Sequence, residues 1–415
     1  MKVEILRGKD HIGGNIIKVT EGETAILLDC GAMLPGIGEA KVKDDFDMGR
    51  IGKVDAMFLS HYHGDHSGLM DKLPAEVDLY TTVETVTFMD KLDMYMNRPL
   101  RTRGRAVHSL FDGESVTVGS LTVTLYITEH SAEGSAMFRV EGGGKTLLYT
   151  GDFKHSLSIP RGVDLLITEG TMLTRDGQAY ADEDEVEMAF RRVFRETEGR
   201  VFVLTSSANL PRIRSVISAR NHDCPDEIRY ANYSYSSGDA PRPIMQDVFL
   251  KYILENTGHK ELAAPYAFIW NQFSDSRSRA YDRIARHYCD TNAAASCRRI
   301  NDLSRAVVFI RPTMVDMLEK LVNEGMELNE DALVFSMWRG YEKDPNVAQL
   351  LALFERFGVQ PKYIHTSGHA DIQHIQELIH KVNPQKIACI HSENAGMIKE
   401  LAGDIPVETG EVIAL

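Results

Sequence analysis

Runs of apolar residues dominate the first third of the chain and predict β-strands. Two runs, residues 15–20 and 24–29, are joined by Glu21-Gly22-Glu23, which is typical of a hairpin. Four further runs are rich in Val, Ile, Leu and Thr, and they predict strands over residues 54–60, 121–128, 145–150 and 163–168.

Apolar positions at helical spacing interleave with these runs. Three predicted helices carry an apolar face, made of Val186, Phe190, Val193 and Phe194 in the first, Val347, Leu350, Leu351 and Phe354 in the second, and Ile372, Ile375, Ile379 and Val382 in the third. Strands that alternate with helices indicate an α/β protein.

Composition narrows the class of protein. The 415 residues carry 46 Lys and Arg against 60 Asp and Glu, a formal net charge of −14, which excludes coating of nucleic acid by charge alone. No stretch approaches the roughly 20 apolar residues of a membrane span, so we expect no membrane contact. The first residues lack a signal-peptide core, which predicts a cytoplasmic protein. Five cysteines without a C-x-x-C pair predict reduced thiols.

Candidate metal ligands gather in the segment Ser60-His61-Tyr62-His63-Gly64-Asp65-His66, directly after a predicted strand. Alternate residues that leave a strand point the same way, so His61 and His63 can bind one ion. Asp65 and His66 follow in a tight turn and can face a second ion.

Further acids and histidines follow other predicted strands. These residues are Asp29, His130, Asp152, Glu169 and His391. Each of them alone is as easily an ordinary polar residue. Together they predict one polar site along one edge of the sheets, with a binuclear metal centre.

This pattern resembles the metallo-β-lactamase superfamily. The resemblance implies an α/β fold, the αββα sandwich, with two divalent metal ions, zinc before manganese or iron. It implies one ion bound by His61, His63 and His130, and another bound by Asp65, His66 and His391, with Asp152 bridging. Asp29 would support these ligands, and Asp65 would also be catalytic.

The long span between Asp152 and His391 implies an insertion. Leu166–Thr171 resembles motif A of the β-CASP branch, which includes ribonuclease J-like metallo-ribonucleases, and residues 364–371 resemble motif B. We therefore predict an inserted α/β β-CASP-like subdomain over residues 196–350, within a metallo-β-lactamase domain made of residues 1–195 and 351–415.

The resemblance also implies catalytic and substrate-binding residues. His369 would act as general acid or contact the leaving group, oriented by Glu169, although His369 could instead cap the next helix. Ser367 and Gly368 suit a turn that cradles phosphate. Ser206, Ser207 and Arg212 open a helix and predict either a phosphate site or an ordinary helix cap. Pro211 stands where the family carries a histidine, which departs from the pattern.

Three functions remain open at this point. The first is a ribonuclease that cleaves single-stranded RNA, or DNA, with arginines at 98–105 and 275–299 as phosphate contacts. The second is a metallohydrolase of a small ester, lactone or thioester, with the insertion as a lid. The third is a binding subunit without activity, which ranks last because all seven ligands are present. Monomer and homodimer are both left open.

Overall fold

The computed structural model describes residues 1–34, 44–155, 159–175, 179–222, 242–270 and 279–415. The chain divides into two compact units. The first unit comprises Met1–Asp90, Pro99–Gly177 and Ser367–Leu415, and the second comprises Lys91–Arg98 and Gln178–Thr366. Each unit has its own sheets and its own core.

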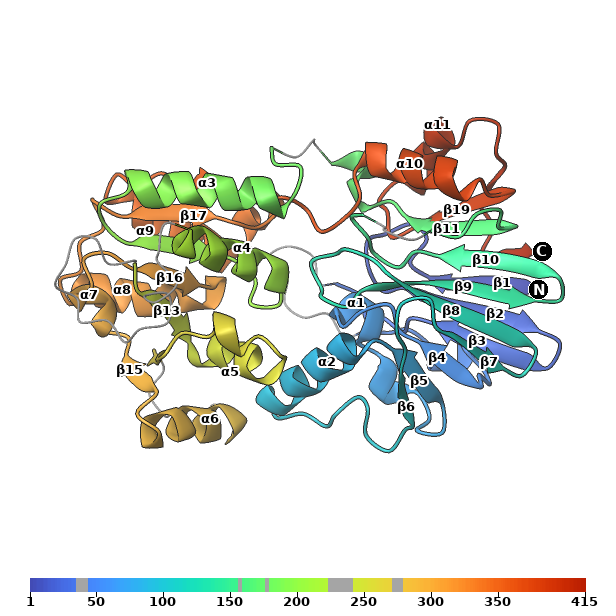
Figure 1. The fold of residues 1–415 in the computed structure, drawn as a ribbon, viewed down its shortest axis with the longest axis horizontal. Helices are drawn as coiled ribbons and strands as arrows, with labels where there is room; N and C mark the ends of the chain where they lie inside the picture. Colours follow the sequence, from blue (N-terminus) through green and yellow to red (C-terminus); the bar gives the residue numbers. More distant parts are fainter. Residues whose placement is uncertain (35–43, 156–158, 176–178, 223–241, 271–278) are drawn as a thin grey trace. The chain divides into compact units, whose positions relative to one another are not determined.

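Two seven-stranded sheets form the centre of the first unit (Figure 1). In spatial order the first sheet contains β21 (Val412–Ala414), β1 (Lys2–Arg7), β2 (Ile16–Glu21), β3 (Thr24–Leu28), β4 (Ala56–Phe58), β5 (Asp78–Thr81) and β6 (Val107–Ser109). The second contains β20 (Val407–Glu408), β19 (Lys386–Ile390), β11 (Leu165–Glu169), β10 (Lys145–Tyr149), β9 (Ala136–Gly142), β8 (Leu121–Ile127) and β7 (Ser115–Val118).

Apolar side chains of both sheets interdigitate in one buried cluster, which includes Ile26 and Phe58 from the first sheet and Phe138 and Leu165 from the second. The helices of this unit are α1 (Gly64–Ser67), α10 (Ile372–Val382), α11 (Ile398–Ala402) and the part of α2 (Val83–Tyr95) that precedes Lys91. α10 and α11 cover the outer face of the second sheet, whereas α1 and α2 lie beside β4 and β5 (Figure 1). This arrangement is the predicted αββα sandwich.

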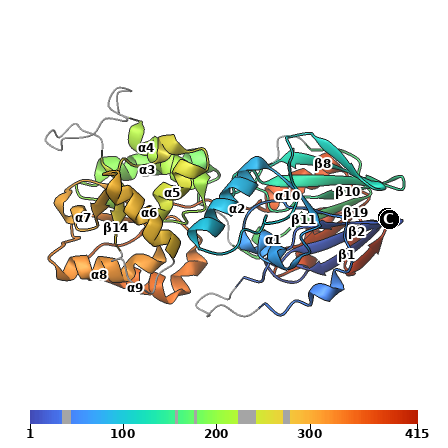
Figure 2. The same ribbon diagram turned by 90° about the horizontal axis from the view of Figure 1, so that it is seen from below.

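The second unit is built on one parallel sheet. Its strands, in spatial order, are β15 (Ala294–Ser296), β14 (Ala267–Ile269), β13 (Ile244–Asp247), β16 (Val307–Ile310), β12 (Val201–Leu204), β17 (Ala332–Phe335) and β18 (Lys362–Tyr363). Its helices are α3 (Glu183–Glu196), α4 (Leu210–Asn221), α5 (Val248–Asn256), α6 (Arg279–Asp290), α7 (Arg299–Asp302), α8 (Val315–Asn323) and α9 (Pro345–Glu355). α8 and α9 cover one face of the sheet, and α3 and α4 cover the other (Figure 2). Helices on both faces explain why β12, β16 and β17 are continuous apolar runs.

The sequence located these elements well, with one error. Every predicted strand overlaps an observed strand, and β2 and β3 form the predicted antiparallel hairpin. The error concerns Ile372, which was assigned to the buried face of α10 but is 44% exposed. Ile372 is the first residue after the cap Asp371, at the end of the helix, and the buried residues of α10 begin one turn later at Ile375. The predicted domain boundaries at 195 and 350 stay predictions.

Two other features complete the fold. Among the described residues, none of the helices combines the length and apolar character that crossing a membrane requires. Part of the basic stretch from 275 to 299, including Arg277, lies outside the described residues.

Candidate metal centre

Strand ends of both sheets deliver the predicted ligands to one site. The chain passes from β4 to His61 and His63, and from β8 to His130. In the second sheet β10 is followed by Asp152, and β19 by His391. Because β10, β11 and β19 are parallel, their carboxyl ends lie at the same edge of that sheet. The structure thus brings together residues that are up to 330 positions apart.

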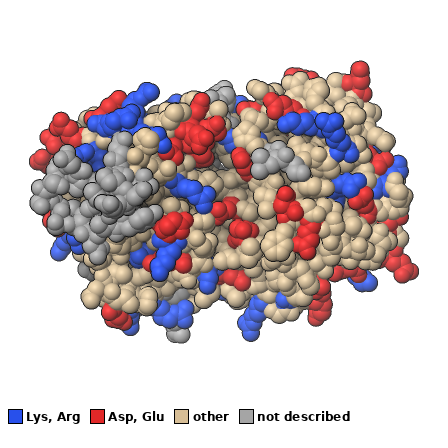
Figure 3. All heavy atoms as spheres, viewed as in Figure 1, with Lys and Arg blue, Asp and Glu red and all other residues tan. Residues whose placement is uncertain are grey.

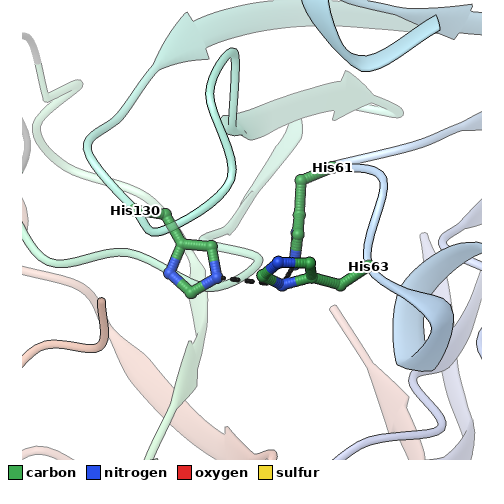
Figure 4. Close-up of side chains that lie close together, drawn as sticks. All are labelled: His61, His63 and His130. Atoms are coloured by element: carbon green, nitrogen blue, oxygen red, sulfur yellow. Dashed lines mark hydrogen bonds between the residues drawn. The ribbon is translucent and has the colours of Figure 1, made fainter. Parts of the chain in front are cut away.

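Three histidines form the first cluster (Figure 4). The Nδ1 atom of His63 lies 3.1 Å from Nε2 of His61 and 3.4 Å from Nε2 of His130. The other nitrogen of His130, Nδ1, lies 2.7 Å from the carbonyl oxygen of Gly368. Because that oxygen can only accept, His130 carries its proton on Nδ1 and presents the Nε2 lone pair to the cluster.

Asp65, His66, Asp152 and His391 form a second, fully buried cluster. Nε2 of His66 lies 3.2 Å from Oδ2 of Asp152, and Nε2 of His391 lies 3.2 Å from Oδ2 of Asp65. The same Asp152 oxygen is 3.8 Å from Nε2 of both His61 and His130. Asp152 therefore lies between the two clusters.

The electrostatics of the first cluster favour neutral imidazoles. Burial lowers the pKa of His61 and His130 well below the usual range, and the charge of neighbouring histidines lowers both further. Burial also lowers the pKa of His63, to about 4. Neutral imidazoles offer lone pairs, which are the form of histidine that binds a metal ion.

In the second cluster, by contrast, the electrostatics favour ionised carboxylates. Burial alone raises the pKa of Asp152, but nearby histidines, His391 foremost, outweigh it and hold that pKa well below its usual range. A hydrogen bond from His391 lowers the pKa of Asp65 in the same way against burial. Burial lowers the pKa of His66, yet Asp152 and Asp29 outweigh it and raise that pKa. Both carboxylates are therefore ionised at neutral pH.

Hydrogen bonds to the ring nitrogens that face away from the clusters orient the predicted histidine ligands. Asp29 accepts a hydrogen bond from Nδ1 of His66 at 2.7 Å, so the structure places these two side chains in contact. The hydroxyl of Thr171 lies 2.8 Å from Nδ1 of His391. Such partners fix the rotation of a ligand imidazole and direct its free nitrogen to the ion.

Two site residues adopt a backbone conformation that is uncommon outside glycine. Asp29 has φ of 59° and His391 has φ of 51°. The left-handed region is sterically costly for residues with a Cβ, by roughly 1–3 kcal/mol, and such strain clusters at functional sites. A third left-handed residue is Gly151, where a Cβ would lie 2.7 Å from the Cβ of Ser60. The turn before Asp152 therefore requires glycine.

His369 lies at the edge of the second cluster. Its Nδ1 atom is 2.8 Å from Oε2 of Glu169 and 3.7 Å from Oδ2 of Asp152. Burial lowers the pKa of His369, but Glu169 and Asp152 outweigh burial and raise it. The helix that follows is capped by Asp371 and not by His369. The structure thus pairs His369 with Glu169, as the sequence predicted.

The predicted substrate-binding residues differ in their exposure, and not all of them are accessible. Ser367 and Gly368 lie in the turn before His369, and Ser206 is exposed before α4. Ser207 is buried, and Asn209 caps α4. Arg212 is fully buried; its guanidinium donates to Glu183, Ser336 and the carbonyl of Thr366, all within the second unit. These bonds favour a structural role for Arg212 over a phosphate contact.

The basic segment 98–105 is also engaged internally. Arg101 and Arg105 are buried, and Arg105 donates to the carbonyl oxygens of Met70 and Val77. Arg98 pairs with Asp93. Arg101 and Arg105 therefore stabilise loops, and only Arg98 and Arg103 of this predicted cluster are exposed.

Sequence reasoning missed two buried side chains of the site. The hydroxyl of Tyr149 donates to Oδ2 of Asp29 at 2.5 Å, and Nζ of Lys154 donates to the carbonyl of Ser367 at 3.0 Å. Both residues lie within three positions of Asp152. Their only sequence signal is a polar group beside a ligand at the end of an apolar strand.

The donor set fits divalent metal ions. Each cluster offers one nitrogen or oxygen atom per residue, and these atoms lie within 4.8 Å of one another. Among the described residues, Nε2 of His66 and Oδ1 of Asp152 are buried without a hydrogen-bond partner. Buried groups of this kind call for a partner, and a metal ion satisfies both.

Comparisons with known proteins agree with this geometry. Residues 24–199 match the family model described as "Beta-lactamase superfamily domain", and residues 359–412 match "Zn-dependent metallo-hydrolase RNA specificity domain". The matched segments carry all seven residues of the two metal clusters, and together they cover more than half of the chain. The chain belongs to the metallo-β-lactamase superfamily.

Relatives place the chain more narrowly. It is 26% identical over 243 residues to ribonuclease J of Mycobacterium tuberculosis (strain ATCC 25618 / H37Rv), which covers 53% of this chain and 42% of that protein. It is 20% identical over 441 residues to cleavage and polyadenylation specificity factor 73 of Drosophila melanogaster, covering 96% of this chain and 60% of that protein. The chain is thus similar to these two proteins, and the matches span 42% and 60% of their own lengths.

A solved structure shows the same fold over the full chain. It is a protein of unknown function from Enterococcus faecalis V583, with a TM-score of 0.73 and 17% sequence identity, covering 100% of this chain and 99% of that one. At this identity the likeness concerns the fold alone.

Proposed function

We propose that this protein is a metal-dependent ribonuclease that cleaves phosphodiester bonds of single-stranded RNA. The observation that carries the proposal is the His369–Glu169 pair, 3.7 Å from Asp152 of the metal clusters. Phosphodiester hydrolysis needs an activated water and a proton for the departing oxygen. Ligand clusters beside a carboxylate-held histidine supply both.

Two divalent ions are proposed, with zinc as the first choice and manganese or iron as alternatives. His61, His63 and His130 would hold one ion, and Asp65, His66 and His391 the other, with Asp152 shared. Mixed imidazole and carboxylate donors suit zinc. When bound, such ions lower the pKa of water and neutralise charge on a phosphodiester.

The side chains of this protein would then move the protons. Water attacks phosphorus, and the Asp65 carboxylate accepts the proton that water gives up. As the bond from phosphorus to the leaving oxygen breaks, Nε2 of His369 donates a proton to that oxygen. Glu169 accepts the Nδ1–H hydrogen bond of His369 and also accepts from the backbone N–H of Phe153 at 3.0 Å. These two bonds keep the imidazole aimed and stabilise its charged form.

RNA as the substrate is supported by the match to an RNA specificity domain over residues 359–412, which contain His369. The names of the relatives support it as well. Ser367 and Gly368 are the proposed phosphate contacts, because they precede His369 in the same turn.

A small ester, lactone or thioester is the second candidate substrate. The observation that favours it is the charge distribution: acidic and basic side chains are interspersed on the visible face of the first unit, and no basic field gathers there (Figure 3). The net charge of −14 also favours a small substrate over RNA, because RNA is itself negatively charged.

Cleavage of end-labelled single-stranded RNA with zinc or manganese tests the proposal. The wild-type protein is compared with Asp65→Asn and with the control Asp78→Asn, a half-exposed carboxylate paired with His108. Cleavage by wild type and by the control, but not by Asp65→Asn, supports the ribonuclease. Intact RNA together with hydrolysis of esters in a parallel panel overturns it in favour of the second candidate.

A further inference from the structure

Tyr149 is a fully buried tyrosine at the end of β10, three residues before Asp152. Its hydroxyl donates to Oδ2 of Asp29 at 2.5 Å. Burial of a hydroxyl is costly without such a partner, and an apolar residue would fill the same space in the core. The hydroxyl therefore calls for an explanation beyond packing.

Asp29 is the point on which four hydrogen bonds converge. Oδ1 accepts from the backbone N–H of Ser60 at 2.7 Å. Oδ2 accepts from the Ser60 hydroxyl at 2.8 Å, from Nδ1 of His66 at 2.7 Å and from Tyr149. An ionised carboxylate, which only accepts, satisfies all four donors at once. Tyr149 contributes the shortest of these bonds.

The consequence reaches His66. Because its Nδ1 proton is held by Asp29, His66 directs its Nε2 atom toward Oδ2 of Asp152, 3.2 Å away. Asp29 itself sits in the strained left-handed conformation, with φ of 59°. Loss of the Tyr149 bond would leave the carboxylate with its three bonds to Ser60 and His66, all on one side, so its orientation would be less restricted.

We propose that Tyr149 is a positioning residue of the metal centre, which acts through Asp29 to set the orientation of His66. The inference rests on the proposed metal site. It assigns Tyr149 no contact with substrate or with the reacting atoms. Its role is to make the second cluster bind a divalent cation tightly and with one geometry.

Tyr149→Phe removes the hydroxyl and keeps the ring. The matched control is Tyr288→Phe in the second unit, where another buried tyrosine donates to a carboxylate, Oε2 of Glu255, at 2.6 Å. Competition between each protein and a chelator for Zn²⁺ measures affinity. We expect Tyr149→Phe to bind zinc up to about tenfold more weakly than wild type, a smaller loss than the 10- to 100-fold expected for a direct partner of a ligand histidine such as Asp29. The control should bind as wild type does.

Spectroscopy separates positioning from general structure. The absorption of the Co²⁺-substituted protein reports ligand geometry, and we expect it to change in Tyr149→Phe but not in Tyr288→Phe. In an Asp29→Asn background, Tyr149→Phe should cost less than twofold more affinity, since both changes break one chain of contacts. Wild-type zinc affinity and an unchanged Co²⁺ spectrum in Tyr149→Phe overturn the inference.

Two further outcomes, a wild-type protein that does not bind metal and a variant that does not fold, are interpreted separately. Failure of the wild-type protein to bind Zn²⁺ or Co²⁺ contradicts the proposed function itself. If Tyr149→Phe does not fold, 3-fluorotyrosine at position 149 keeps the side chain while changing the acidity of its hydroxyl. A shifted Co²⁺ spectrum at 149, with none for the same replacement at 288, supports the inference, and no shift at either position overturns it.

Discussion

The imidazole of His130 donates its Nδ1 proton to the carbonyl oxygen of Gly368 at 2.7 Å. This bond ties a predicted metal ligand to the turn that carries His369, although the two residues are 238 positions apart in sequence. The backbone at Gly368 therefore links a predicted metal ligand, His130, to the proposed proton donor, His369.

Gly368→Ala tests this coupling. A Cβ at position 368 would lie 2.6 Å from the backbone nitrogen of Ser131, so the turn must shift away from His130. We expect at least a tenfold loss of zinc affinity together with a loss of RNA cleavage. Gly410→Ala, where a Cβ finds its nearest contact at 3.4 Å, should leave both unchanged. Equal behaviour of the two variants would contradict the coupling.

Lys154→Met should reduce turnover more than metal binding. Nζ of this buried lysine donates to the carbonyl of Ser367, so its loss loosens the turn before His369 while the ligand side chains stay. We expect about a tenfold fall in kcat, the equivalent of about 1.4 kcal/mol. Lys251→Met is the control, because that buried lysine also donates to a backbone carbonyl, in the second unit. A fall in kcat of the same size in the control would refute this reading of Lys154.

His369→Ala and Glu169→Gln probe the proposed proton donor. Loss of a general acid costs about 100- to 10,000-fold in rate. We expect His369→Ala to lower the rate of RNA cleavage by a factor in that range. Glu169→Gln should lower the rate less, since its amide still contacts Nδ1 of His369. Both variants should keep the zinc content of the wild type, measured by elemental analysis. Full activity of His369→Ala would remove this residue from the mechanism.

Arg212→Met should destabilise the second unit. The variant leaves Glu183 without its partner and frees the Ser336 and Thr366 oxygens. Breaking a buried ion pair costs about 3–5 kcal/mol, and Glu183 is 30% exposed, so we expect about 3 kcal/mol in urea unfolding. RNA affinity of an Asp65→Asn protein should be unchanged by the further Arg212→Met substitution. A large loss of affinity without destabilisation would restore Arg212 as a phosphate ligand.

Thiol reactivity provides a pH-dependent check of the fold. Burial raises the pKa of Cys30 and of Cys389 to about 12, so both remain protonated thiols at pH 8. Thiolates, not thiols, react with iodoacetamide. Among the four cysteines that the structure describes, we expect exposed Cys289 to be modified first at pH 8, with mass spectrometry locating the label. Rapid labelling of Cys30 in the folded protein would show that the loop after β3 is open.

The sequence predicted the fold and the ligand clusters because their signals are local. His61 and His63 follow a strand directly, and strand ends in a sheet share an edge. Tyr149 could not be found in this way, since a tyrosine that ends an apolar strand is usually core. The prediction of Arg212 as a phosphate contact has a similar explanation. An arginine at the start of a helix suits a phosphate, but the burial of Arg212 depends on Glu183 and Ser336. Only the tertiary structure brings these two residues near. Ile372 shows that helical spacing does not identify the first residue to reach the core.

Pairing of β11 with β19 sets the order in which the site can assemble during synthesis. Leu165 and Lys386 are register partners in adjacent strands, although the larger segment of the second unit, Gln178–Thr366, is encoded between them. At roughly 5–20 residues per second, a ribosome needs on the order of 10–50 s between Asp152 and His391. Throughout that interval the nascent chain carries an unfinished sheet edge and six of the seven ligands. The candidate metal centre of the nascent protein therefore stays incomplete until Gln178–Thr366 of the second unit has been synthesised.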